Sequence, residues 1–319
     1  MLISVLMPAR NAAATLPEAL HGLRNQRGAP PTEIVCVDDA STDATGTILE
    51  EANVEVVKGH GAGLVAALNL GLAHCKGDLV ARMDADDLVH PDRLKLQAGM
   101  LAGDPSLGAV GSLVECDAPG LKRLEKWLNQ TVSKEQCRNA RFIEAPLVHP
   151  STTFRREALA GGWQDNGWAE DWDLLLRLVE DGWELAKVPR QLLVWRDSPH
   201  RLTRTHDVYA EDRMFRLRAH YLARGPLKGR EFDIWGAGPT GKRLARELEA
   251  HGLRPRTFFG VDRKKQRARG RPVLTERELP PPGSALMLCA VGAAGAREEI
   301  RSLLEPRGYA EGRDFLFTA

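Results

Sequence analysis

The chain has 319 residues, with 43% hydrophobic and 27% charged side chains and a formal net charge of +1. This is the balance of a globular protein of one large or two ordinary domains, and it excludes a disordered or fibrous chain. No apolar run approaches the roughly 18 residues that a membrane-spanning helix needs. The five cysteines include no C-x-x-C pair. We therefore expect a cytoplasmic protein with reduced thiols and no zinc site.

The charges are unevenly distributed along the chain. Residues 1–200 hold 20 Lys and Arg against 28 Asp and Glu, whereas residues 201–275 hold 19 against 8. A basic segment of this kind indicates either a polyanionic partner, such as RNA or a membrane surface, or an arginine-rich surface that simply faces solvent. The second interpretation is the simpler one.

Strand and helix signals alternate through the first hundred residues. The predicted strands are 3–7, 34–37, 54–57 and 79–83. The predicted helices are 15–25, 42–52 and 64–74, with another entered at Pro91. Thr15 and Glu18 fit a capping box for the first helix, and Ser41 or Thr42 would cap the second. This alternation predicts βαβ units and an α/β fold with a mostly parallel sheet.

Polar segments follow three of these strands. They are Pro8-Ala9-Arg10-Asn11, Asp38-Asp39 and Asp84-Ala85-Asp86-Asp87. Ligands of open α/β sheets bind beyond the carboxyl ends of the strands, so we expect the three segments to converge on one site.

The acidic segment predicts a metal site. Asp84 and Asp86 are two residues apart, which in extended backbone places both side chains on the same side. Carboxylates this close repel each other unless a cation lies among them, and their hard oxygens suit Mg²⁺ or Mn²⁺. An acidic turn that caps the next helix is an equally good interpretation of the spacing alone, particularly for Asp87.

The middle of the chain is less regular. We expect a strand at 107–115, a helix at 122–141, a turn and strand at 149–154, a helix opened by 168–173, a strand at 188–195 and a helix at 205–224 that ends at Gly225-Pro226. The tail restarts a βαβ pattern at about Arg230. The expected domains are 1–204, a helical linker at 205–228, and a smaller Rossmann-like α/β domain at 229–319.

The tail carries a G-x-G-x-x-G turn made by Gly236, Gly238 and Gly241, and Asp262 follows at about the distance of a ribose-binding acid. This pattern predicts either a dinucleotide site or a structural or regulatory module. The segment has only about 90 residues, half of a full dinucleotide fold, which favours the module over a working NAD(P)-dependent oxidoreductase.

Four motifs of the first 200 residues together resemble the family 2 glycosyltransferases, in that family's order and spacing. They are Val5-Leu6-Met7-Pro8-Ala9-Arg10-Asn11, Val37-Asp38-Asp39-Ala40-Ser41-Thr42-Asp43, Arg82-Met83-Asp84-Ala85-Asp86-Asp87 with Pro91-Asp92-Arg93-Leu94, and Glu170-Asp171-Trp172-Asp173-Leu174. Each motif alone is weak, and the four together identify the chain as a member of that family.

The resemblance implies a GT-A fold, a nucleotide-sugar donor (commonly a UDP-sugar), a Mn²⁺ or Mg²⁺ ion and inversion at the anomeric carbon. Asp171 matches the catalytic base, Asp86 the main metal ligand, and Asp84 a residue facing both ribose and metal. Asp39 matches the carboxylate that binds the donor base. The other implied donor-binding positions are Pro8, Ala9, Arg10, Asn11, Asp38 and Ala85.

The acceptor side is less defined. His149 opens a segment that resembles the family's acceptor-side strand, but it also fits a turn histidine before a proline. Glu170 fits either acceptor binding or a helix cap. The sequence leaves open which sugar and which acceptor are used, as well as the oligomeric state.

A looser likeness extends over most of the chain. The segments Lys126-Trp127-Leu128-Asn129-Gln130, Ile234-Trp235-Gly236-Ala237-Gly238 and Glu311-Gly312-Arg313-Asp314-Phe315 are similar to the queuosine-tRNA galactosyltransferases. This likeness implies that the basic segment 201–275 binds tRNA. A cell-envelope glycan or lipid-linked acceptor is the alternative. The rival functions are an oxidoreductase built on the tail and a nucleotide-sugar sensor without turnover.

Overall fold

The computed structural model describes residues 1–197, 202–260 and 266–319. The chain divides into two compact units. Unit 1 comprises Met1–Cys137, Pro146–Asn166 and Glu170–Thr205. Unit 2 comprises Arg138–Ala145, Gly167–Ala169 and His206–Ala319. Two short segments that precede residue 170 therefore belong to unit 2, although the sequence around them belongs to unit 1. The expected boundaries 1–204, 205–228 and 229–319 stay a prediction.

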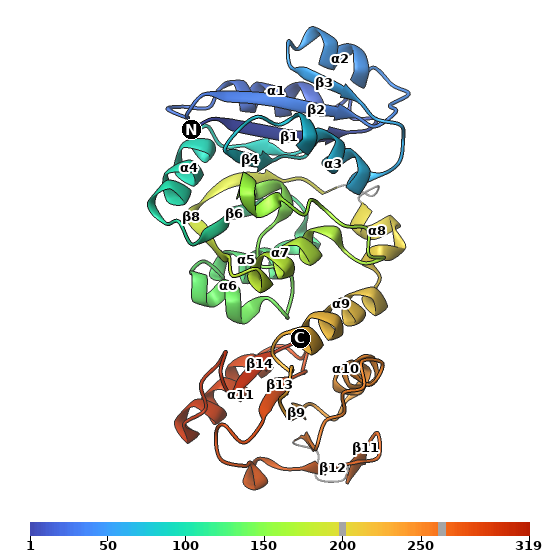
Figure 1. Ribbon diagram of the computed structural model, residues 1–319, viewed down its shortest axis with the longest axis vertical. Coiled ribbons are helices and arrows are strands. Elements are labelled where there is room, and N and C mark those ends of the chain that lie inside the picture. Colours follow the sequence, from blue (N-terminus) through green and yellow to red (C-terminus); the bar gives the residue numbers. More distant parts are fainter. Residues whose placement is uncertain (198–201, 261–265) are drawn as a thin grey trace. The chain divides into compact units, whose positions relative to one another are not determined.

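Unit 1 is built on one mixed sheet (Figure 1). Its strands are β1 (Ile3–Ala9), β2 (Thr32–Asp38), β3 (Glu55–Lys58), β4 (Leu79–Arg82), β5 (Leu88–Val89), β6 (Leu107–Cys116), β7 (Thr153–Arg155) and β8 (Glu184–Trp195). The order is β3-β2-β1-β4-β7-β6-β8-β5. Strands β3, β2, β1 and β4 are mutually parallel, as expected, whereas β7 runs antiparallel to both β4 and β6.

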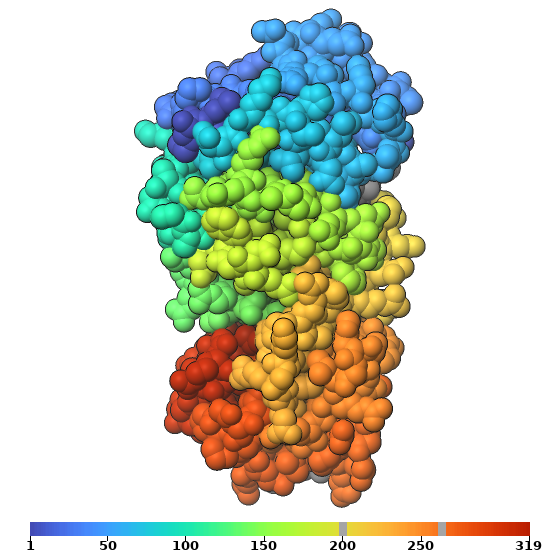
Figure 2. Space-filling model, viewed as in Figure 1, coloured from blue at the N-terminus to red at the C-terminus, as the bar shows by residue number. Residues whose placement is uncertain are grey.

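Helices pack against both faces of this sheet. They are α1 (Leu16–Arg24), α2 (Thr45–Glu51), α3 (Leu64–His74), α4 (Arg93–Gly103), α5 (Lys122–Gln130), α6 (Lys134–Ala140), α7 (Glu170–Glu180) and α8 (Leu202–Thr205). Ile3 and Val5 of β1 pack with Leu16 of α1 in the main core. On the opposite face α3 approaches so closely that a Cβ at Gly71 would lie 2.3 Å from Leu6 Cδ1. Figure 2 shows the segment around α3, in light blue, at the surface of unit 1.

The predicted capping box of the first helix is wrong. Thr15 is already in helical geometry and makes no side-chain cap; its hydroxyl donates back to the Ala12 carbonyl at 3.4 Å. Glu18 instead accepts a hydrogen bond from Arg196 Nη2 at 2.7 Å. The second helix begins at Thr45, later than predicted, because Ser41 and Thr42 bond to Asn11 of the preceding loop.

The helix predicted at 122–141 is two helices, α5 and α6. The break is at Thr131, which is extended, and the Val132 carbonyl then accepts a hydrogen bond from the Lys187 amide of β8 at 2.9 Å. Gln136 Oε1 accepts from the amides of Val132 and Ser133, so the start of α6 is capped from within. A hydrogen-bonding partner 55 residues away in sequence thus outweighs a continuous helical pattern.

Unit 2 contains the second sheet, which also has the expected α/β character. Its strands are β9 (Phe232–Trp235), β10 (Phe258–Phe259), β11 (Arg267–Ala268), β12 (Arg271–Leu274), β13 (Leu286–Cys289) and β14 (Phe315–Phe317), in the order β11-β12-β10-β9-β13-β14. All pairs except β11–β12 are parallel. The accompanying helices are α9 (Glu211–Arg224), α10 (Pro239–Glu249) and α11 (Ala296–Leu304). Across the described residues of both units, none of the helices has the length and apolarity needed to cross a membrane.

Lys187 of β8 is buried, and keeping its side chain charged there reduces the free energy of unfolding. It is 1% exposed, and Nζ donates to the Leu128 carbonyl at 2.5 Å. Burial lowers the pKa of Lys187 from 10.5 to about 8, a difference of about 3 kcal/mol. Between pH 8 and 10.5 the unfolded chain binds more protons at this site, so this contribution makes the protein more stable as pH rises through that window.

We therefore expect Lys187→Met to remove this pH dependence. Denaturant unfolding of wild type and variant at pH 7 and pH 9 should show the wild type gaining free energy of unfolding relative to the variant at the higher pH. The comparison between the two proteins cancels the titration of the shared cysteines. Identical pH dependence of the two would contradict the assignment.

Candidate active site

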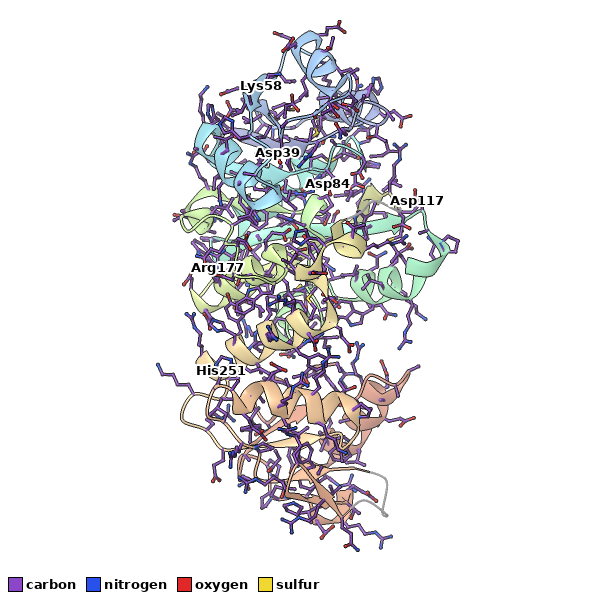
Figure 3. The ribbon with its side chains drawn as sticks, turned by 90° about the vertical axis from the view of Figure 1, so that its right-hand side faces the viewer. Asp39, Lys58, Asp84, Asp117, Arg177 and His251 are labelled. Carbon is purple, nitrogen blue, oxygen red and sulfur yellow. The ribbon has the colours of Figure 1, made fainter. Side chains whose placement is uncertain are left out.

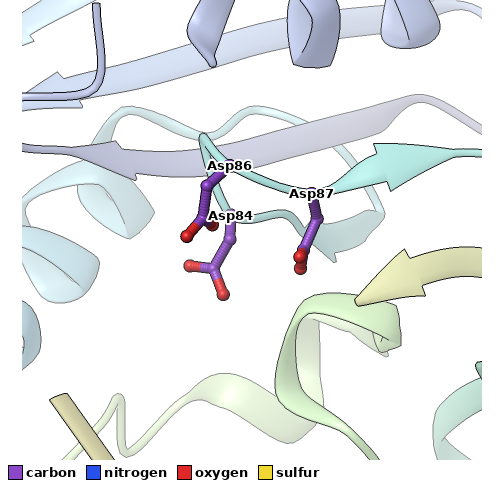
Figure 4. Close-up of side chains that lie close together, drawn as sticks. All are labelled: Asp84, Asp86 and Asp87. Carbon is purple, nitrogen blue, oxygen red and sulfur yellow. The ribbon is translucent and has the colours of Figure 1, made fainter. Parts of the chain in front are cut away.

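The predicted acidic site forms immediately after β4. Asp84, Asp86 and Asp87 each bring one carboxylate oxygen into a cluster whose atoms all lie within 4.8 Å of one another (Figure 4). Strand β4 is buried throughout, and the turn after it doubles back into β5, which gathers the three side chains at one edge. Asp84 and Asp86 are half-buried and Asp87 is 1% exposed.

Asp87 is not the helix cap that the spacing also allowed. Its Oδ1 accepts a hydrogen bond from the Arg196 amide at 2.9 Å, and its Oδ2 is buried with no hydrogen-bonding partner among the described residues. Burial, together with the charges of Asp84 and Asp86, raises the pKa of Asp87 well above its usual range. A buried carboxylate oxygen without a donor is unfavourable unless a cation neutralises it.

Arg82, the last residue of β4, lies against the acidic cluster; the sequence motif included it without giving it a role. It is 3% exposed, its Nη1 contacts Asp84 Oδ1, and its Nε has no hydrogen-bonding partner within the described part of the chain. Its charge partly opposes the rise in pKa that burial causes at Asp87 and Asp171. An arginine two residues before an acidic motif on a buried strand was the available signal, because a buried guanidinium needs carboxylates around it.

Asp171 belongs to the same charged environment. It is the second residue of α7, and its Oδ1 accepts a hydrogen bond from the Trp172 amide at 2.7 Å. Burial raises the pKa of Asp171 above its usual value, and the charge of Asp84 adds to this effect, whereas the Trp172 amide and Arg82 oppose it. Asp171 thus interacts electrostatically with Arg82 and Asp84, although 87 residues separate Asp171 from Asp84 along the chain. Its role as the base stays a prediction.

His149 and Glu170 also meet. His149 opens the short 3₁₀ helix His149–Ser151, directly before Pro150, and is 7% exposed. Its Nε2 accepts a hydrogen bond from Trp163 Nε1 at 2.9 Å, and its Nδ1 lies 3.8 Å from Glu170 Oε1. Burial, reinforced by Arg82, holds the pKa of His149 well below its usual range. The ring is therefore neutral with its proton on Nδ1, facing Glu170. Trp163 was not predicted from the sequence.

Asp39 follows β2, and Asp84 follows β4. Because β1 lies between β2 and β4 in the sheet, the two residues lie on either side of the end of β1 (Figure 3). The two carboxylate oxygens of Asp39 accept hydrogen bonds from the amides of Gly61 at 2.8 Å and Gly63 at 3.2 Å. A pocket of about 220 Å³ opens beside it, lined by Asp39, Gly59, His60, Ala62, Ala66, Ala67 and Leu70. Each carboxylate oxygen keeps a lone pair that can still accept from a ligand.

The remaining predicted donor-side residues hold the loops in place. Buried Asp38 accepts hydrogen bonds from the Ser41 amide at 3.0 Å and Lys58 Nζ at 3.4 Å. Burial alone would raise the pKa of Asp38. The hydrogen bonds from Ser41 and Lys58 and the charge of Lys58 have the larger effect, so the pKa lies below its usual value. Asn11, at φ 51°, bonds to Ser41 and Thr42. Pro8 is half-buried, Ala9 and Ala85 are buried and Arg10 is exposed. Donor contacts of all these residues stay a prediction.

The glycines of the tail are explained largely by packing. A Cβ at Gly241 would lie 1.8 Å from the Gly236 carbonyl oxygen, and one at Gly236 would lie 2.5 Å from that of Ala290. Gly238 has no such neighbour within 4 Å. Asp262 lies outside the described residues. Close packing of strand and helix thus accounts for two of the three glycines, and nucleotide binding by Gly236, Gly238, Gly241 and Asp262 stays a prediction.

Comparisons with known proteins agree with this geometry. The family model "Glycosyl transferase family 2" matches residues 4–162. The chain is 28% identical over 173 residues to the amylovoran biosynthesis glycosyltransferase AmsE of Erwinia amylovora, an alignment that covers 52% of this chain and 64% of AmsE. The chain thus matches less than two thirds of that relative's length.

Solved structures share the fold. TarS residues 1–349 of S. aureus, in complex with UDP-GlcNAc, superposes with a TM-score of 0.57 at 20% identity, covering 79% of this chain and 72% of that one. The mannosyltransferase PcManGT of Pyrobaculum calidifontis, in complex with GDP-Man and Mn²⁺, gives 0.52 at 24% identity, covering 69% and 61%. The expected GT-A fold is confirmed. The family model includes Asp39, the acidic cluster and the strands that precede them, and the chain belongs to glycosyl transferase family 2.

Proposed function

We propose that the protein transfers a sugar from a nucleotide-sugar donor, a UDP-sugar in the first instance, to an acceptor hydroxyl with the help of a divalent metal ion. The observation that carries the proposal is the convergence of three carboxylates within 4.8 Å with the buried Arg82 and Asp171 beside them. TarS and PcManGT, with their nucleotide-sugar complexes, support the donor class.

The residues at the site fit Mn²⁺ or Mg²⁺. All the donors are hard carboxylate oxygens, and Oδ2 of Asp87 is buried without a partner among the described residues. Asp86 and Asp84 would hold the ion, with Asp87 close behind them. Once bound, such an ion neutralises the donor diphosphate and polarises its bond to the sugar.

Asp171 acts as the general base in this proposal. Ionised, it accepts the proton of the acceptor hydroxyl while that oxygen forms its bond to the anomeric carbon and the nucleoside diphosphate leaves with the bonding electron pair. Two features favour its ionised form: the charge of Arg82 and the N-terminus of α7. Attack from the face opposite the leaving group inverts the anomeric configuration.

The pocket beside Asp39 fits the donor base. A carboxylate that already accepts two backbone amides is fixed in direction, so its remaining lone pairs can select a ring N–H of the base. The flanking Ala66, Ala67 and Leu70 offer an apolar wall. In this proposal Glu170 contributes to the acceptor side, where its carboxylate can orient a hydroxyl, and the neutral His149 ring beside it fixes the direction of that carboxylate.

The acceptor itself is proposed only as a class. A tRNA bound by the basic segment 201–275 remains one proposal, and a glycan or lipid-linked acceptor is the other. Several of the segment's arginines are neutralised within the protein: Arg243 pairs with Glu211 and Asp212, and Arg269 with Glu249. These ion pairs reduce the charge available to phosphates.

A donor panel tests the proposed function. With Mn²⁺ present, we expect at least one of UDP-glucose, UDP-galactose, UDP-GlcNAc and GDP-mannose to raise the melting temperature and to be hydrolysed slowly, releasing the nucleoside diphosphate. ATP at the same concentration is the control for non-specific binding of a metal–nucleotide complex. If ATP raised the melting temperature and none of the four nucleotide sugars did, the proposal would be contradicted.

A further inference from the structure

Hydrogen bonds hold the two residues that lead into the acidic cluster. The Arg82 amide donates to the Thr152 carbonyl at 2.9 Å, and the Met83 amide donates to the Leu6 carbonyl at 3.1 Å. The carbonyl of the buried Arg82 needs a donor as well. The direction in which the chain leaves β4 towards Asp84 depends on these contacts.

Arg93, the first residue of α4, supplies that donor. Its Nη2 donates to the Arg82 carbonyl at 2.7 Å, and its Nη1 donates to Met83 Sδ at 3.3 Å. Nη2 also donates to the Thr152 carbonyl at 3.4 Å. One guanidinium therefore contacts both residues that precede Asp84, and it shares the carbonyl that accepts the Arg82 amide.

Gln97, one turn further along α4, fixes this guanidinium in turn. Its Oε1 accepts hydrogen bonds from Arg93 Nε at 3.0 Å and from Thr153 Oγ1 at 2.7 Å. Its Nε2 donates to the carbonyls of Val110 at 2.9 Å and Ser151 at 2.7 Å. Arg93, Gln97 and Thr153 are all 0% exposed. A fully buried network of this kind allows the guanidinium one orientation.

Stability alone does not explain an arginine at this position. Burial lowers the pKa of Arg93 from 12.5 to about 9; the charge of Asp87 opposes this shift and that of Arg82 adds to it. Among the described residues, its hydrogen bonds go to carbonyl, amide and sulfur acceptors and none reaches a carboxylate. A well-packed apolar side chain is often at least as stable as a buried charge. The neighbouring carboxylates, however, repel one another while no ion is bound, so the backbone that carries them has to be held.

We propose that Arg93 is a positioning residue for the metal site: its guanidinium fixes the backbone before Asp84, so that Asp84 and Asp86 are directed at the ion before it binds. This role rests on the proposed function, because it acts through the ion. The loss on removing Arg93 should therefore be confined to the metal-dependent part of nucleotide binding. The pocket beside Asp39 should keep its own affinity, since the amides of Gly61 and Gly63 hold that carboxylate.

The test is calorimetric binding of UDP to wild type and Arg93→Met, once in Mn²⁺ and once in EDTA. Methionine fills most of the same space without a hydrogen-bond donor. We expect the affinity in Mn²⁺ to fall by about 5-fold or more, as when residues that support metal ligands are removed, while the affinity in EDTA changes by less than about 2-fold. A general loss of folded protein would lower the binding capacity under both conditions, so the ratio of the two affinities reports on the metal site.

Arg155→Met is the matched control. Arg155 also donates to backbone carbonyls, to that of Leu107 at 3.1 Å and that of Leu101 at 2.7 Å, but it pairs with Leu79 at the opposite end of β4 from the acidic cluster. This variant should keep the wild-type ratio. Arg93→Lys is a milder second variant that retains the buried charge. One ammonium cannot reproduce the fork, so we expect a loss of about 3-fold in Mn²⁺ and none in EDTA.

A wild-type ratio in Arg93→Met or Arg93→Lys, or an equal loss in Arg155→Met, overturns the inference and leaves the proposed metal site intact. Combining Arg93→Met with Asp86→Ala tests whether Arg93 acts through the ion, because the double variant should then bind UDP no more weakly than Asp86→Ala alone. A further loss of about 5-fold in the double variant overturns the inference as well. If wild type itself binds UDP equally in Mn²⁺ and EDTA, the proposed metal-dependent function fails, and the role of Arg93 fails with it.

Discussion

Asp171→Asn is expected to reduce sugar transfer by a factor of about 100 to 10,000, the usual contribution of a general base. The carboxamide has nearly the same shape, and its oxygen can still accept the Trp172 amide, so the start of α7 should be preserved. It cannot take the proton of the acceptor hydroxyl. The measurement is the steady-state rate of UDP release, together with calorimetric binding of UDP in Mn²⁺, which should stay within 2-fold of wild type.

Asp173→Asn is the matched control on the same helix. Asp173 is fully buried, but it pairs with Arg177 at 2.9 Å. We expect this variant to lose stability while keeping its turnover per folded molecule, because the substitution leaves Asp171 in place. Turnover near wild type in Asp171→Asn, or an equal loss in both variants, would show that Asp171 is not the base.

The sequence predicted those parts of the site that lie next to strand ends. Asp39, Asp84 and Asp86 follow buried parallel strands, and strand order places such positions side by side once the βαβ pattern is recognised. Asp171 came from the family resemblance alone. Local pattern could mark it as the start of a helix, but its position beside Asp84 depends on packing between α7 and the sheet, which periodicity does not encode.

Other features depend on partners that are distant in sequence. Trp163 donates a hydrogen bond to His149, 14 residues away, and this relation has no spacing signature. The helix predicted at 122–141 was broken by a hydrogen bond from β8 for the same reason. The assignment of Gly167–Ala169 to unit 2 is a further case, because three residues carry no domain signal of their own. The pair of Arg82 with Asp84, by contrast, is local and could have been predicted.

Asp86→Ala is expected to abolish the effect of Mn²⁺ on nucleotide binding. Asp86 is one of three carboxylates that lie within 4.8 Å of one another, so its removal would take away a proposed ligand and a negative charge, and Mn²⁺ would bind more weakly. In wild type, EDTA should lower the affinity for UDP at least 10-fold. In Asp86→Ala the affinity should equal that of wild type in EDTA and should not respond to the chelator.

Asp92→Ala provides the comparison that makes this result specific to the cluster. Asp92 lies six residues further along the chain and pairs with Arg27 at 3.0 Å and Arg190 at 3.3 Å, outside the acidic cluster. Its removal takes away the same charge without touching the proposed ligands, so the response to Mn²⁺ and EDTA should match wild type. If Asp86→Ala retained wild-type affinity in Mn²⁺, the acidic cluster would hold no catalytic ion. Arg82 would then have to stabilise the charge of the departing diphosphate, and one buried guanidinium already paired with Asp84 is a poor substitute for a divalent cation.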